Sequence, residues 1–106
     1  MQIEELNMFA ALFDIYGKLL SKTQYELFSE FLNFNLSESE LAESVGSTRQ
    51  SVHDAITKAK KQLLSFEDSC GVLKSRDIAK EKLLKIKTQS TDEKVIKLID
   101  DVIDTL

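Results

Sequence analysis

The chain has 106 residues, no proline and only three glycines, and 30% of its residues are charged. At this length it should form one domain that buries roughly two-thirds of its unfolded surface, and the composition predicts an all-α protein. It has no apolar run of about 18 residues to span a membrane, and its one cysteine cannot form an internal disulfide. We expect no export leader, because no charged-then-apolar pattern opens the sequence. We therefore expect a cytoplasmic protein without membrane insertion.

Charge is distributed unevenly along the chain. Residues 1–57 contain three bases and nine acids, residues 58–87 nine bases and four acids, and residues 88–106 two bases and five acids. The basic middle segment could meet a phosphate backbone, or it could simply be the solvated face of a helix. The sequence leaves both interpretations open.

The first third of the chain predicts two helices, because apolar residues recur about every 3.6 positions. The first helix is expected over residues 3–20, with a stripe formed by Leu6, Phe9, Phe13, Tyr16 and Leu20. A capping box of Ser21 and Gln24 then opens a second helix over residues 23–33. Its stripe is formed by Leu27, Phe28, Phe31 and Leu32.

Residues 37–66 are typical of a helix-turn-helix motif. Ser37 and Glu40 form a capping box for its first helix, whose apolar face is expected to be Leu41, Ala42 and Val45. Gly46 follows, where a chain that leaves a helix commonly needs a positive φ. Ser47 and Gln50 form the next capping box, so the second helix begins almost at once and crosses the first steeply. Ala42 is small where the two backbones should approach.

The second helix of the motif has two distinct faces on a helical wheel. The expected core face is Val52, Ala55, Ile56, Ala59, Leu63, Phe66 and Cys70. The opposite side has Arg49, Gln50, His53, Thr57, Lys60 and Lys61. A helix-turn-helix that reads DNA places the first turns of this helix in the major groove, where Arg bonds guanine, Gln bonds adenine and Ser or Thr serves either.

These considerations give a candidate nucleic-acid-binding set. It consists of Thr48, Arg49, Gln50, Ser51, His53, Thr57, Lys60 and Lys61, of which the lysines would follow backbone phosphates. Asp54 opposes Arg49, the one base in the reading portion. Helix-turn-helix units also serve as compact packing or as protein contacts, so an adaptor that uses the same face is the alternative.

The sequence predicts no catalytic residues, no metal site and no cofactor. A second histidine is missing for a ligand set, and we interpret His53 as an ordinary exposed polar residue. Cys70 continues the apolar stripe and is expected to behave as a small buried hydrophobe. No phosphate-binding glycine loop or catalytic triad pattern is present. We therefore predict a protein that is not an enzyme.

The C-terminal part is expected to be a helical extension, residues 73–106, added to a helix-turn-helix domain of residues 1–72. After a break near Gly71 we predict a helix over residues 74–87, and a capping box of Ser90 and Glu93 opens a last helix over residues 91–106. That helix has a wide apolar face: Val95, Ile96, Leu98, Ile99, Val102, Ile103 and Leu106. It could cover Leu64, which the motif leaves exposed, or form a two-fold homodimer.

The same residues resemble a known family, the YlxM-like proteins of Gram-positive bacteria and mollicutes. The resemblance lies in Asn7-Met8, the segment from Leu12 to Gln24 and the segment from Leu36 to Ile56. It covers about residues 6–67 firmly and the basic C-terminal part loosely. Thr48 stands where the family usually has Ser, and His53 stands where Tyr is common.

The resemblance implies both a fold and a function. It implies a helix-turn-helix related to winged-helix domains and to region 4 of sigma factors. It also implies an accessory or regulatory protein of the signal recognition particle pathway, with particle RNA, the particle GTPase or its receptor as partners. A stand-alone DNA-binding transcription regulator is the alternative function.

Overall fold

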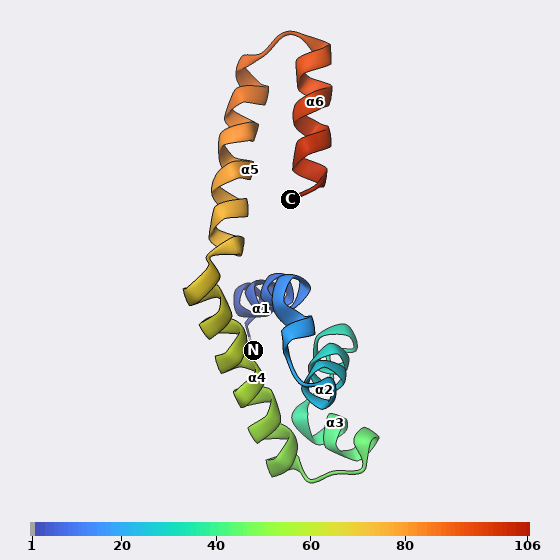
Figure 1. The fold of residues 1–106 in the computed structure, drawn as a ribbon. Coiled ribbons are helices and arrows are strands. Elements are labelled where there is room, and N and C mark those ends of the chain that lie inside the picture. The colour runs from blue at the N-terminus through green and yellow to red at the C-terminus, as the bar shows by residue number, and fades with distance from the viewer. Residues whose placement is uncertain (1) are drawn as a thin grey trace. The chain divides into compact units, whose positions relative to one another are not determined.

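The computed structural model describes residues 2–106, which form α-helices, one short 3-10 helix and no strand (Figure 1). The elements are α1 (Ile3–Tyr16), η1 (Gly17–Leu19), α2 (Lys22–Asn33), α3 (Glu38–Val45), α4 (Arg49–Cys70), α5 (Val72–Gln89) and α6 (Glu93–Asp104). The predicted all-α class is confirmed. The elements fall into two compact units, Met1–Cys70 and Gly71–Leu106.

The first unit is organised around α4, which packs against α1, α2 and α3. Its most deeply buried large side chains come from all four helices: Leu12, Phe28, Leu41, Val52, Ile56 and Leu63. Burying each such side chain stabilises the folded protein by about 1.5–3 kcal/mol. Rings from α1 and α2 also pack together, since Phe13 stacks on Tyr25 with the ring centroids 4.9 Å apart. This core fixes the helix-turn-helix on a support made of α1 and α2.

The start of α2 agrees with the sequence, whereas the end of α1 does not. The predicted capping box at Ser21 is present, with its hydroxyl accepting from the Gln24 amide at 3.2 Å. The first helix was predicted to reach residue 20, but α1 ends at Tyr16 and η1 follows. The backbone of Leu20 is extended because Leu20 directly precedes Ser21, the N-cap of α2. Its side chain still reaches the core, with 7% of its surface exposed.

Two predicted core residues of the motif are exposed. Val45 is 44% exposed, because α3 is short and its last residue faces a pocket beside α2 rather than the core. Cys70 is exposed as well, so its interpretation as a buried hydrophobe is wrong. Tyr16, the last residue of α1, contacts Phe66 and Glu67, so the cover provided by α1 ends one turn before Cys70. Leu64 is 45% exposed.

The second unit is a hairpin of α5 and α6, which lie side by side (Figure 1). Lys87 Nζ and Asp100 Oδ1 form an ion pair at 2.7 Å across it, and Ile99 is its one buried hydrophobic residue. The predicted box of Ser90 and Glu93 is wrong, since Asp92 caps α6 by accepting from the Lys94 amide at 2.9 Å. Ser90 instead accepts from the Asp92 amide within the loop, which delays the helix start to Glu93.

Candidate nucleic-acid interface

The turn between α3 and α4 is closed by backbone hydrogen bonds. Gly46 adopts φ +70°, and the Ser47 amide reaches back to the Ala42 carbonyl at 2.9 Å. This is the left-handed helix ending that glycine permits without strain. The predicted capping box of Ser37 and Glu40 at the start of α3 is present. The motif is therefore fixed at both ends of its first helix.

The second helix of the motif begins one residue later than its predicted capping box requires. Thr48 is the cap, because its Oγ1 accepts from the Ser51 amide at 3.1 Å. The Ser47 amide donates to the Ala42 carbonyl, so it does not make the reciprocal bond to Gln50 that a capping box needs. Gln50 donates instead from Nε2 to Asp54 Oδ1 at 2.9 Å. The box of Ser47 and Gln50 is therefore wrong, although the motif that it announced is present.

Three of the predicted binding residues come together at the start of α4. Arg49, Gln50 and His53 line one surface depression, together with Glu38 from α3. All three predicted side chains are exposed. A guanidinium, an amide and an imidazole side by side on the first two turns of a helix are the groups that hydrogen-bond base edges. α3 packs against α4, and Ala42 of α3 is only 5% exposed, which fits the small residue predicted at their crossing.

The remaining predicted residues are distributed differently. Thr48 is committed to capping, and Ser51 lies on the other side of α4, where it lines a separate pocket with α2. Thr57 and Lys61 continue the side of α4 that carries Gln50, since they follow it at helical spacing. Lys61 is exposed and well placed for a phosphate one to three turns beyond the reading residues.

Lys60 is held inside the first unit rather than presented to solvent. Its ammonium group lies 5.4 Å from the ring centroid of Phe9 and 5.8 Å from that of Phe31, and 3.8 Å from a Glu5 carboxylate oxygen. Its side chain is 26% exposed. Contacts of this kind tie α4 to α1 and α2. The structure therefore does not place Lys60 with the other predicted binding residues.

Two acidic residues modify the interface, and the sequence interpretation named only one of them. Glu38 Oε2 lies 2.8 Å from His53 Nδ1, and Asp54 holds the Gln50 amide. The Asp54 contact could be expected from the spacing of four residues on one helix. The Glu38 contact joins residues 15 apart through the helix crossing, so no local signal announces it. Both carboxylates lower the positive potential around Arg49.

The rest of the described chain offers little other chemistry. Residues 2–106 contain no group of three His, Cys, Asp or Glu side chains placed to hold a metal ion. No helix within these residues is both long and apolar enough to cross a membrane. The depression at the start of α4 is lined by polar side chains alone, Glu38, Arg49, Gln50 and His53.

Comparison with known proteins gives a consistent result. The family model of UPF0122, helix-turn-helix proteins described as YlxM / p13 like, matches residues 3–102. A UPF0122 protein of Mycoplasma mycoides is 32% identical over 102 residues, which cover 95% of this chain and 90% of the relative. A UPF0122 protein of Clostridium acetobutylicum is 31% identical over 107 residues, covering 94% and 92%. One from Acetivibrio thermocellus is 32% identical over 107 residues, covering 92% of each chain.

Proposed function

Because the chain belongs to the UPF0122 family of YlxM/p13-like helix-turn-helix proteins, we propose that it binds nucleic acid through the first turns of α4. One observation carries the proposal: Arg49, Gln50 and His53 share a surface depression at the start of α4. Arg49 would bond a guanine edge or a phosphate, and Gln50 would bond an adenine edge after releasing Asp54. Lys61 would contact the backbone further along.

The biological role is that of an accessory or regulatory protein of the signal recognition particle pathway. The resemblance to YlxM-like proteins supports this assignment, and the particle RNA is then the first target to examine. The particle GTPase and its receptor are protein partners compatible with the same role. The protein acts by binding rather than by catalysis and works in the cytoplasm, where the particle is found.

Two other functions compete with this one. A stand-alone transcription regulator would use the same three side chains on promoter DNA. A protein–protein adaptor is favoured by a specific observation, since the polar face already contains the contacts of His53 with Glu38 and of Gln50 with Asp54. A surface that mixes acids and bases suits a protein partner better than a polyanion.

The second unit is proposed to join two copies of the chain. It has 36 residues and one buried hydrophobic residue, Ile99, and units below about 40 residues usually need a disulfide, a metal or oligomerisation for stability. On α6 the exposed side chains of Val95, Leu98 and Val102 form a stripe beside the face that packs on α5. Basic side chains outnumber acidic ones on α5, and acidic side chains outnumber basic ones on α6. The α5 helix of one copy is therefore complementary in charge to the α6 helix of another. A two-fold dimer would present two motifs to a paired target.

Fluorescence anisotropy with labelled particle RNA and a labelled DNA duplex tests the proposed activity. We expect binding at low salt that weakens as salt is raised. The logarithm of the binding constant should fall against the logarithm of the salt concentration with a slope of about −2 to −3, because few exposed basic side chains lie near the depression. Arg49→Ala should cost about 1–3 kcal/mol if the guanidinium bonds a base. Arg76→Ala removes a charge of the same kind from α5 and is the matched control. Absence of binding to RNA and DNA alike at low salt would reject the proposal and leave the adaptor.

A further inference from the structure

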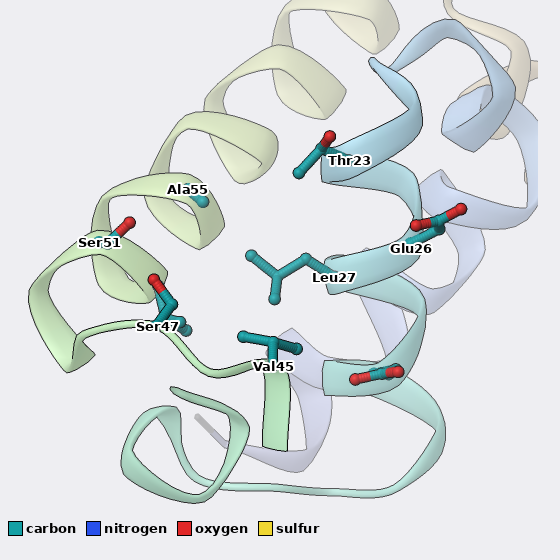
Figure 2. Close-up of a pocket in the computed structure, with 9 residues that line it drawn as sticks. Thr23, Glu26, Leu27, Val45, Ser47, Ser51 and Ala55 are labelled. Atoms are coloured by element: carbon teal, nitrogen blue, oxygen red, sulfur yellow. The ribbon is translucent and has the colours of Figure 1, made fainter. Parts of the chain in front are cut away.

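A pocket of about 340 Å³ lies in the first unit, between α2 and the start of α4 (Figure 2). It occupies the side of α4 that carries Ser51 and Ala55, not the side that carries Gln50. Its lining residues are Thr23, Glu26, Leu27, Glu30, Val45, Ser47, Ser51, Val52 and Ala55. One wall is a single face of α2, since its four residues follow helical spacing, and the turn after α3 closes one end.

The interior of this pocket is mainly apolar. Leu27 and Val45 extend into it from α2 and from the end of α3, and Ala55 faces them from α4 (Figure 2). Val45 is 44% exposed despite its apolar side chain, so the pocket keeps an aliphatic surface in contact with water. Covering such a surface with an apolar group of a ligand is favourable in proportion to the area removed from water.

The pocket is also acidic. Glu26 and Glu30 line it, and none of its nine lining residues is a base. Oε2 of Glu30 is buried and has no hydrogen-bond partner among the described residues. This oxygen is closed to water, so it is not itself the point where a ligand would make contact. A ligand that brings a positively charged donor is complementary in charge to the two carboxylates that line the pocket.

We propose that this pocket binds an arginine side chain of a partner protein. The aliphatic stem would pack on Leu27 and Val45, and the guanidinium would donate to Glu30. Arginine fits better than lysine, because its planar group donates several hydrogen bonds, is weakly hydrated and pairs with carboxylates in bidentate fashion. A volume of about 340 Å³ accommodates one such side chain with a neighbouring group.

The partner is a protein segment rather than a free guanidinium compound. A free cation would neutralise Glu30 but would leave the exposed surface of Val45 in water. A residue next to the arginine in a peptide would cover that surface. Phosphate is disfavoured, because two carboxylates line the pocket, so this surface is separate from the nucleic-acid interface on the other side of α4.

Two blocked peptides test this assignment: N-acetyl-Leu-Arg-Leu-amide and its citrulline counterpart, which has the same shape without the charge. Each is titrated to about 10 mM into the 15N-labelled full chain while amide chemical shifts are recorded. We expect saturable shifts at Leu27, Val45, Ser51 and Ala55 for the arginine peptide. The citrulline peptide should bind roughly tenfold more weakly, the difference expected of a charge-assisted hydrogen bond.

Variants separate this site from its surroundings. Glu30→Gln should abolish the preference for arginine over citrulline, whereas Glu43→Gln, on an exposed position of α3 outside the pocket, should keep it. Glu30→Gln should leave the affinity for RNA or DNA unchanged, so failure of the two proposals is distinguishable. Equal shifts with both peptides, or no shifts at the pocket residues at the highest concentration, would overturn the proposal.

Discussion

His53 Nδ1 lies 2.8 Å from Oε2 of Glu38, so a side-chain contact joins the second helix of the motif to the first on the proposed binding surface. The same depression contains Arg49 and Gln50. An acidic group at this position stabilises the arrangement of the free protein but repels a phosphate backbone. The strength of nucleic-acid binding should therefore depend on Glu38 as well as on the basic side chains of the protein.

Replacing Glu38 with Gln should strengthen nucleic-acid binding by roughly threefold to tenfold at low salt, because it removes a negative charge beside Arg49 and releases His53. Anisotropy titrations of the variant measure this change. Glu43→Gln is the control, since it removes an exposed carboxylate of α3 that does not line the depression. Equal effects of both substitutions would mean that only net charge matters and that the depression is not the binding surface.

Replacing Ala42 with Leu should destabilise the fold by about 1–3 kcal/mol, because the added methylenes overpack the crossing of α3 and α4. Thermal and urea unfolding followed by circular dichroism measure the change. Ser44→Leu, on an exposed position of α3, should change stability by less than about 0.5 kcal/mol. If the two variants unfold alike, Ala42 is not at a tight crossing.

Thr48→Ala should lower the free energy of unfolding by about 0.5–2 kcal/mol, because it leaves the Ser51 amide without its side-chain acceptor. Ser47→Ala should lie within about 0.5 kcal/mol of the parent, since the Ser47 backbone rather than its hydroxyl closes the turn. Urea denaturation of both variants distinguishes the two caps. A larger loss for Ser47→Ala would restore the capping box predicted from the sequence.

Leu98→Asp should convert a dimer of the chain into a monomer, because Leu98 is 64% exposed on the α6 stripe and would place a charge in the proposed contact. Light scattering at micromolar concentration should give twice the 12.0 kDa of the chain for the parent and the single mass for the variant. Ile3→Asp, at a residue 76% exposed in the first unit, should remain dimeric. Ile99 is a poor choice for this test, because it is buried in the hairpin and its replacement would also unfold it. A parent mass of 12.0 kDa would exclude the dimer.

Local patterns predicted most of the first unit, because the information for helix starts and faces lies within a few residues. The boxes at Ser21 and Ser37 and the burial of Ile56 and Leu63 are confirmed. Caps were misplaced where several short polar residues stand together. Ser47 and Ser90 matched the pattern, but hydrogen bonds in the turns made Thr48 and Asp92 the actual caps.

The candidate site was harder to predict, because its members are selected by tertiary packing. A helical wheel places Lys60 on the same side as Arg49 and His53, but α1 and α2 cover that position and Glu5 lies beside it. The contact of Glu38 with His53 depends on the helix crossing, and the pocket at Val45 depends on how far α2 extends. None of these features has a signature at short sequence separation.

Amide chemical-shift mapping of the 15N-labelled chain with particle RNA, and separately with a DNA duplex, tests the central claim most directly. We predict that the largest shifts with the bound nucleic acid fall on Arg49, Gln50, His53 and Lys61, with Glu38 responding through His53. The basic helix α5 should show smaller changes that vanish as salt is raised, because it would contribute only nonspecific attraction. Shifts confined to residues 72–89, with residues 48–53 unchanged, would contradict the assignment of the start of α4 as the binding surface.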